Sequence, residues 1–204
     1  MAADAKTQAE TKDTIPLWLA VAITVCVSLP FGIWLGNYNL PIWASFIVWA
    51  EYFAMGSKPA VLKTMVPAYI LGVIGAAILM TAYALLSTAL GNTKIYTPTD
   101  LALFVACFVG FCVLIYAMKW FPVTQVGSLP FFNGISMLLA VYFTGAFVKP
   151  FGASLDANLL PSAAAVGAIL AGLLGAALGW FNVTILFPRP VASVRSTGHQ
   201  PAGV

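Results

Sequence analysis

Charge is scarce in this sequence. Only 7% of its 204 residues are charged, whereas a soluble domain carries about 25%. Because 61% of the residues are hydrophobic, this composition predicts an integral membrane protein, and we expect it to contact the lipid bilayer. The net charge of +3 is small and no basic cluster occurs, so we expect no nucleic-acid partner.

Residues for catalysis and metal binding are few as well. The single histidine, His199, lies in the polar C-terminal tail, and Cys26, Cys107 and Cys112 lie in apolar runs. An odd number of cysteines without a pairing pattern argues against a disulfide framework, and small buried hydrophobic residues are the simpler interpretation. No nucleotide-binding loop, nucleophile elbow or metal-ligand spacing occurs. We therefore expect no enzyme, no cofactor and no metal site.

The ends of the chain differ from its middle. Residues 1–14 are polar with mixed charge, and residues 188–204 are polar and contain Pro and Gly. Both are predicted to be disordered cytoplasmic segments. Residues 15–187 are predicted to form one membrane domain, because a spanning helix needs roughly 20 apolar residues. Six spans are expected, at 15–35, 40–55, 66–90, 101–118, 129–147 and 163–187.

The positions of lysine and arginine predict an orientation, since basic residues gather in cytoplasmic loops. With the N-terminus inside, most basic residues fall on the cytoplasmic side, so both termini are expected there. The inner residues are Lys6, Lys12, Lys58, Lys63, Lys119, Arg189 and Arg195, and the outer residues are Lys94 and Lys149.

The second and fifth spans are similar to each other. Residues 40–56 read LPIWASFIVWAEYFAMG, and residues 129–145 read LPFFNGISMLLAVYFTG. A Lys-Pro pair follows each of them, and the third and sixth spans share runs rich in Gly and Ala. Because each half then has three spans, the sequence predicts an all-α fold with a 3+3 inverted repeat. Such a repeat places a solute site near the middle of the bilayer.

Proline and glycine predict breaks in these helices. Pro30 is expected to break the first span or end it early, and Asn133-Gly134 is expected to interrupt the fifth span near its start. Irregular backbone at membrane depth is tolerated where it is buried in protein or lines a cavity. The breaks are therefore candidate pore-lining positions. The alternative is that each Leu-Pro simply starts a helix and the bundle has no pore.

The sixth span carries glycines at helical spacing. Gly175 and Gly179 form a GxxxG motif, and Gly167 and Gly172 precede it. Small residues let helix backbones approach closely in lipid. The sequence leaves open whether this face packs within the bundle or against another subunit, and we expect a homo-oligomer.

Glu51 lies deep in apolar sequence, in the run IVWAEYFAMG at 47–56. A charge at the centre of a bilayer costs about 2.5 kcal/mol or more. Under the predicted orientation, Glu51 lies roughly 7 Å from the cytoplasmic end of its span. It either reaches toward Lys58 or Lys63, or faces a water-filled cavity where it would draw cations or carry a proton. The matching position in the fifth span is Ala140, so Glu51 breaks the symmetry of the repeat.

Further candidates for a solute path are polar and aromatic side chains within the spans. The polar groups would replace part of a solute's hydration shell, and the aromatic rings would narrow the path. Each hydroxyl could instead bond to a neighbouring backbone carbonyl. With Glu51, the candidates are Ser45, Asn133, Ser136, Thr144, Phe131, Phe132 and Tyr142.

The run Trp-Ala-x-Phe-Ile-x-Trp-Ala at residues 43–50, with the Gly-rich third and sixth spans, resembles the YcdZ-like family. These are small bacterial inner-membrane proteins with a domain of unknown function. The resemblance covers residues 15–187 and implies the fold and the location, but no substrate. A small residue commonly follows the run in that family, whereas this sequence has Glu51, so the resemblance implies no role for Glu51.

Two weaker resemblances point to transport. SLPFFN at residues 128–133 is similar to the Leu-Pro-Phe-Asn stretch of urea channels, with Phe132 as an extra residue. Six spans in a 3+3 layout are also similar to formate/nitrite and acetate channels. We therefore expect a channel or transporter that carries a short carboxylate, urea or an amide, or a small cation by facilitated diffusion. The alternative is a non-transporting membrane subunit that stabilises a larger complex.

Overall fold

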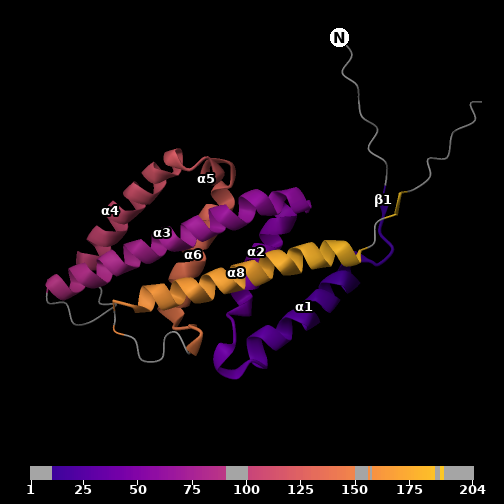
Figure 1. Cartoon of the computed structure of the whole chain (residues 1–204), viewed down its shortest axis with the longest axis horizontal. Coiled ribbons are helices and arrows are strands. Elements are labelled where there is room, and N and C mark those ends of the chain that lie inside the picture. The colour runs from indigo at the N-terminus through magenta and orange to yellow at the C-terminus, as the bar shows by residue number, and fades with distance from the viewer. Residues whose placement is uncertain (1–10, 91–100, 150–155, 157, 187–188, 191–204) are drawn as a thin grey trace, which may run out of the picture.

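The computed structural model describes residues 11–90, 101–149, 156, 158–186 and 189–190. The described chain is almost wholly helical, which confirms the expected all-α class. Three short 3-10 turns, Gly36–Tyr38, Pro59–Val61 and Met118–Trp120, adjoin the longer helices. The helices are α1 Leu17–Ile33, α2 Ile42–Ala54, α3 Leu62–Ala89, α4 Leu101–Ala117, α5 Pro122–Val126, α6 Ser128–Thr144 and α8 Leu160–Ile185 (Figure 1).

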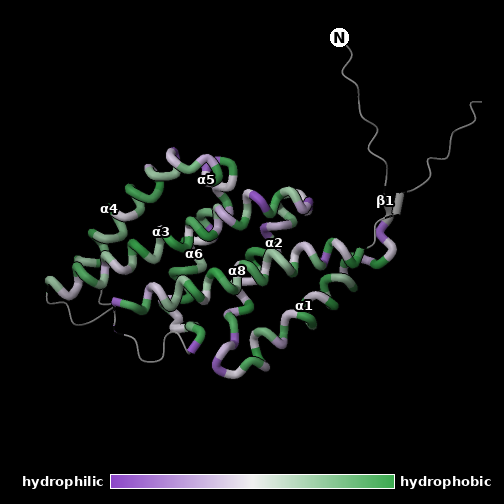
Figure 2. The backbone as a smooth tube through the Cα atoms, in the orientation of Figure 1, coloured by the Kyte–Doolittle hydropathy of each residue, from purple (hydrophilic) through white to green (hydrophobic). Residues whose placement is uncertain are grey.

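Three helical segments are long and apolar enough to cross a bilayer: Pro59–Ala89, Leu101–Trp120 and Leu160–Ile185. The helices α1, α2 and α6 are also apolar but shorter, with 10–17 residues each. Hydrophobic residues follow the helices through the body of the molecule, as the green segments of Figure 2 show. The lengths and composition of these helices agree with a membrane protein.

Prolines lie close to where several helices begin or end. Pro41 immediately precedes α2, and Pro130 lies in the first turn of α6. The N–H groups of a first turn have no partner within the helix, so proline loses no hydrogen bond there. Pro30 lies inside α1, which ends soon afterwards at Ile33. The expected interruption at Asn133-Gly134 was wrong, because α6 runs unbroken through both residues.

Gly134 stays helical because its role is to let two helices touch. A Cβ at Gly134 would overlap the carbonyl oxygen of Tyr69 in α3, and a Cβ at Gly72 would overlap the carbonyl oxygen of Phe131 in α6. The absence of both side chains lets the two backbones meet. Of the contacts between described elements, the one between α3 and α6 is the most extensive.

The helix α8 packs against α2 in a similar way. Gly175 faces the backbone carbonyl of Ser45, and a Cβ at Gly179 would lie 2.9 Å from the Cβ of Tyr52. The glycine face predicted in the sixth span therefore packs within the bundle. The sequence left open whether this face contacts the same chain or another subunit, and the contact with α2 is within the same chain.

The two longest helices lie side by side in the middle of the molecule (Figure 1). On their outer sides, α4 lies next to α3, and α1 lies next to α8, while α2 and α6 cross behind them at a steep angle. The core forms where α2, α3, α6 and α8 meet.

The first and last described segments meet at one end of the bundle. The strand β1, Thr11–Lys12, pairs antiparallel with β2, Arg189–Pro190. The backbone N–H of Thr14 also donates to the carbonyl of Leu186 at 3.0 Å. Residues 1–10 and 191–204, which make up most of the two tails predicted to be disordered, lie outside the described residues.

Substituting Gly134→Ala should destabilise the protein by about 1–3 kcal/mol, because the added methyl group would force α3 and α6 apart. Gly167→Ala is the matched control, since a Cβ there would lie an ordinary 3.8 Å from Val141. Thermal unfolding of the purified protein in detergent would compare the two. Equal midpoints for both variants would contradict the close crossing.

Candidate functional site

The helix α2 has a buried side and an exposed stripe. Its exposed positions recur at helical spacing, at Trp43, Ile47, Ala50 and Ala54. At about 100° per residue, Glu51 lies at the edge of the buried side, next to that stripe. The buried residues are Ala44, Ser45, Val48, Trp49, Glu51 and Tyr52.

Glu51 is paired with an amide of α6. Its side chain is only 3% exposed, and the Nδ2 of Asn133 donates to its Oε1 at 2.9 Å. Its second oxygen, Oε2, is buried and has no hydrogen-bond partner. In the described part of the chain no ion pair joins the carboxyl to Lys58 or Lys63. The partner of Glu51 is therefore a neutral group on another helix.

Stability does not explain a glutamate at this position. An ionised carboxyl without a cationic partner is costly in apolar surroundings, and one neutral donor offsets only part of that cost. The matching position in the fifth span, Ala140, does without a polar side chain. A buried carboxyl with this little support is therefore a candidate functional group.

Tyr69 of α3 lies beside this pair. Its ring is 2% exposed and packs against Gly172 of α8. Its hydroxyl donates to the carbonyl of Ala168 at 3.0 Å, and the phenol is close enough to Glu51 for a Coulombic interaction. Tyr69 thus joins α3 to α8 next to the carboxyl. This role could not be predicted from the sequence, because a tyrosine in an apolar run does not reveal its distant partner.

More buried polar atoms without partners lie along α2. The Oγ of Ser45, the Nε1 of Trp49 and the hydroxyl of Tyr52 have no hydrogen-bond partner among the described residues. The Oδ1 of Asn182 in α8 is a further case, although its Nδ2 donates to Thr24 of α1 at 2.9 Å. Native proteins rarely leave such groups unsatisfied. The helix α2 therefore has unused hydrogen-bonding capacity. Asn182 was not among the residues predicted from the sequence to line a solute path.

The other predicted path residues do not gather at one place. Phe131 and Tyr142 are buried, whereas Phe132, Ser136 and Thr144 lie on the exposed side of α6. The hydroxyl of Thr144 donates to the carbonyl of Ala140 in its own helix at 2.7 Å. Of the eight candidates, Glu51 and Asn133 are the two that a hydrogen bond joins across helices.

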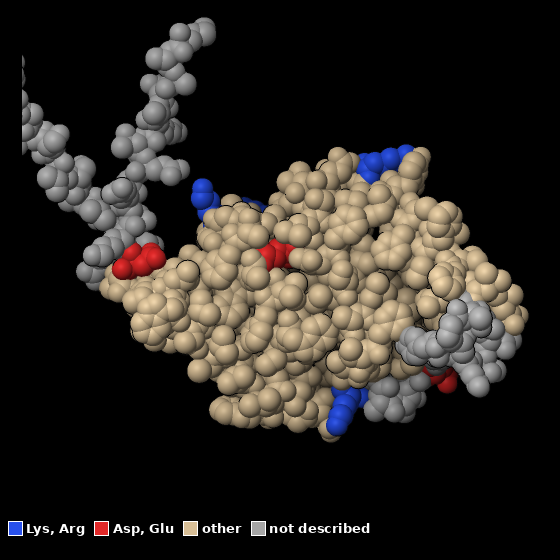
Figure 3. All heavy atoms as spheres, turned by 180° about the vertical axis from the view of Figure 1, so that it is seen from behind, with Lys and Arg blue, Asp and Glu red and all other residues tan. Residues whose placement is uncertain are grey.

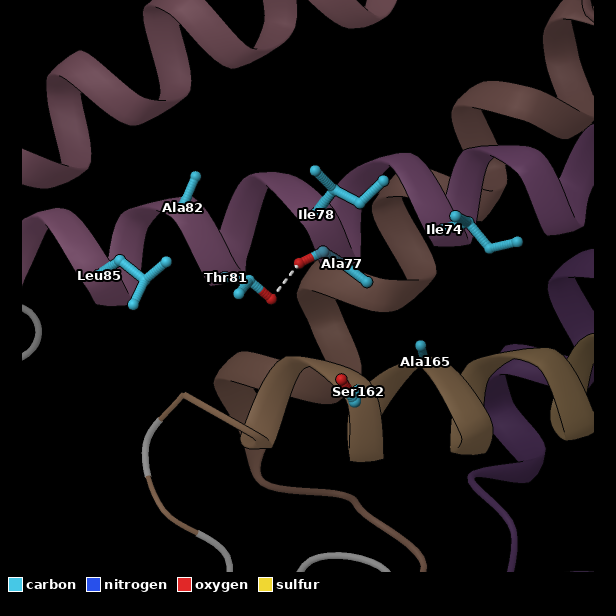
Figure 4. A pocket seen from close by; sticks show the side chains of 8 residues that line it. All are labelled: Ile74, Ala77, Ile78, Thr81, Ala82, Leu85, Ser162 and Ala165. Atoms are coloured by element: carbon cyan, nitrogen blue, oxygen red, sulfur yellow. Dashed lines mark hydrogen bonds between the residues drawn. The ribbon is translucent and has the colours of Figure 1, made fainter.

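Two grooves between the described helices are apolar, and Glu51 does not line either of them. A groove of about 440 Å³ separates part of α3 from α8 (Figure 4), and its one drawn hydrogen bond runs from Thr81 to the carbonyl of Ala77. A groove of about 280 Å³ lies where α3, α4, α5 and α6 meet and includes Phe131. Neither groove includes Glu51 or Asn133. Figure 4 labels the lining of the first: Ile74, Ala77, Ile78, Thr81, Ala82, Leu85, Ser162 and Ala165.

These features define a small helical protein with apolar helices that suit a membrane, packed around one buried carboxyl–amide pair. Residues 14–185 match the family described as "Protein of unknown function (DUF1097)", and the chain belongs to that family. This match confirms the expected family without an assigned function, while the YcdZ-like name stays a prediction. No curated protein and no solved structure matches the chain.

Substituting Asn133→Ala should cost about 1–3 kcal/mol of stability, because it leaves both oxygens of Glu51 buried without a donor. Glu51→Gln should be at least as stable as the natural chain, since the Gln Oε1 still accepts from Asn133 and no charge is buried. Chemical unfolding in detergent would measure both.

The control for this prediction is Thr144→Val, which removes a bond within one exposed helical turn. It should change the free energy of unfolding by less than about 0.5 kcal/mol. Equal losses for Asn133→Ala and Thr144→Val would mean that the pair between α2 and α6 contributes nothing special.

Proposed function

We propose that this protein is a channel or transporter through which a small solute crosses the membrane by facilitated diffusion, with Glu51 in the path. The supporting observation is a carboxyl that is 3% exposed, has one neutral donor and keeps one oxygen without a partner. Ionisable residues within membrane helices mark solute and proton pathways. The candidate solutes are a short carboxylate, urea or an amide, and a small cation.

The proposed fold has six spans arranged as an inverted repeat of α1–α3 and α4–α8. In this repeat α1 corresponds to α4, α2 to α6 and α3 to α8. The contact between α3 and α6 therefore corresponds to the contact between α8 and α2, and the contact between α3 and α4 corresponds to that between α8 and α1. The two helices of each of these pairs make contact, and α4 flanks α3 as α1 flanks α8 (Figure 1). This correspondence in packing supports the repeat that the two similar spans predicted.

The directions of the helices support six crossings. Gly75 of α3 faces Leu114 of α4, while Gly110 of α4 faces Leu79 of α3, so these neighbours are antiparallel. In Figure 1, α1 and α3 run one way along the length of the molecule and α4 and α8 return, while α2 and α6 cross them steeply in opposite directions.

The length of α2 fits a site within the bilayer. With 13 residues, it extends about 20 Å, which is less than the hydrocarbon thickness of about 30 Å. Short helices that end within the membrane are the elements that build solute sites in inverted-repeat transporters.

The proposed location is a bacterial inner membrane, with both termini in the cytoplasm. Lys58 and Lys63 lie at the junction of α2 and α3, Lys119 ends α4, and Lys149 follows α6 on the way to α8. Figure 3 shows basic atoms near the edges of one face and a small acidic patch amid uncharged atoms. Three basic residues at two inner junctions, against one at an outer junction, support this orientation.

The second candidate function is a membrane subunit that stabilises a larger complex without transporting anything. The observation in its favour is the exposure of the fourth span: Leu101–Trp120 has a mean hydropathy of 2.6, yet only 6% of its most apolar window is buried. A homo-oligomer would cover the same surface, and so would lipid. A transporting homo-oligomer should be stable alone, whereas a subunit should require a different partner.

The orientation predicts which loops a membrane-impermeant maleimide can reach in intact cells. In a chain without Cys26, Cys107 and Cys112, Asp156→Cys should react from outside, because it lies between α6 and α8. Lys58→Cys should react only after the membrane is opened. Reaction of Lys58→Cys in intact cells would contradict the orientation.

Liposomes that contain the purified protein should take up at least one solute faster than empty liposomes do. Stopped-flow light scattering would test urea, acetamide, formate, acetate and guanidinium. Glu51→Gln should slow that solute by about tenfold or more, because a hydrogen bond to a charged group is worth about 1.5–3 kcal/mol.

The control in these liposomes is Thr184→Val, which removes a hydrogen bond within one exposed turn of α8 and should leave the flux unchanged. Flux equal to that of empty liposomes for all five solutes would favour the subunit function, and a co-purifying partner should then be sought. Normal flux in Glu51→Gln would instead remove Glu51 from the path.

A further inference from the structure

The Glu51 site offers a hydrogen-bond acceptor without a free donor beside it. Asn133 already donates to Oε1, and Oε2 has no partner. Neither of the unpaired donors nearby in the sequence of α2, Trp49 and Tyr52, bonds to Oε2. Trp49 precedes Glu51 by two residues and so points about 200° away around the helix, and the ring of Tyr52 packs against Gly179 of α8.

Such a site matches a ligand that donates but does not accept. Ammonium and guanidinium ions carry several N–H donors and no acceptor, as the side chains of Lys and Arg do. Urea can also donate an N–H to Oε2, but urea is neutral and cannot replace the positive charge of a proton on that oxygen. A carboxylate would face an acceptor oxygen and, when Glu51 is ionised, a like charge. The site therefore favours a small cation among the three proposed solute classes.

The same reasoning indicates what neutralises Glu51 when no cation is bound. Within the described chain no lysine or arginine pairs with the carboxyl, and a buried carboxylate without a counter-charge is strongly disfavoured. A proton on Oε2 removes the charge. A proton also needs no cavity, and Glu51 does not line either of the two grooves described above.

We propose that Glu51 exchanges one proton for one small cation with N–H donors. The O–H bond at Oε2 breaks and the proton passes to water, while an N–H of the cation donates to the same oxygen. One positive charge leaves as another arrives, so the net charge of the site stays constant. Asn133 holds Oε1 in both states. This exchange rests on the proposed function, because the cation must reach Glu51 through the solute path. It narrows the three proposed solute classes to the small cation.

Few other ionisable groups lie on the helices around Glu51. The helix α8 carries none, and the one on α1, Cys26, is exposed. The phenol of Tyr69 interacts with Glu51, and its proton is engaged with the carbonyl of Ala168. Phenols and amines keep their protons near neutral pH as a rule. The phenols and amines on the helices around Glu51 are Tyr52 on α2, Lys63, Tyr69 and Tyr83 on α3, and Tyr142 on α6.

Proton release from the purified full-length protein tests the exchange directly. In weakly buffered detergent solution with a pH indicator, millimolar guanidinium should release about one proton per chain. Tetramethylammonium has the same charge but no N–H donor, and should release none, as should urea and sodium chloride. Each tenfold rise in proton concentration on the acid side should weaken the apparent guanidinium affinity about tenfold, because one proton competes with one cation.

Two variants complete this experiment. Glu51→Gln should abolish the release, whereas Asp156→Asn, which changes an exposed carboxyl between α6 and α8, should leave it unchanged. The comparison of guanidinium with tetramethylammonium uses the natural chain, so it holds even if Glu51→Gln folds poorly. Equal release by both cations, no release by guanidinium, or full release from Glu51→Gln would each overturn the proposal.

Liposome flux separates this proposal from the proposed function. Proton release without flux of guanidinium or any other solute would support the exchange site and count against transport. Flux of urea or acetate without proton release by guanidinium would support transport and overturn the exchange. If Glu51→Gln lowers both the guanidinium flux and the proton release that guanidinium causes, the exchange and the transport function are both supported.

Discussion

The backbones of α3 and α6 touch because Gly72 and Gly134 have no side chains, and the rest of the bundle depends on this contact. It fixes α6 against a long central helix and thereby determines which side of α6 is buried. The corresponding contact of α8 with α2 fixes the other short helix. With both short helices held against long ones, Glu51 and Asn133 come within 2.9 Å of each other. The polar pair is thus a consequence of glycine packing, although its own chemistry is quite different.

The sequence was sufficient for the helical class and for the approximate extent of the six longer helices, because apolar runs bounded by Pro, Gly and Lys carry that information locally. It also identified Glu51 as exceptional and the glycines of the sixth span as a packing face. It failed at Gly134, because a glycine that permits a helix crossing and a glycine that ends a helix look alike in one sequence. The partner of Glu51 could not be predicted either, since 82 residues separate it from Asn133.

The polar pair also makes the two halves unequal. When the second and fifth spans are aligned at their Leu-Pro pairs, Glu51 corresponds to Ala140 and Asn133 corresponds to Ala44. The same place in the partner half is therefore apolar on both helices. The packing agrees with the proposed repeat, because it needs only small residues at the crossings. The ionisable chemistry does not follow it, and so gives the two sides of the bundle different properties.

Each half of the chain packs mainly on the other half, which has a consequence for biosynthesis. The helix α2 finds its glycine-lined neighbour in α8, and α3 finds its closest neighbour in α6. A ribosome that adds about 5–20 residues per second needs roughly 4–16 s to pass from Glu51 to Asn133, which lies 82 residues later. Until the second half has been made, α2 and α3 lack their main packing partners, and Glu51 lacks the amide that pairs with it.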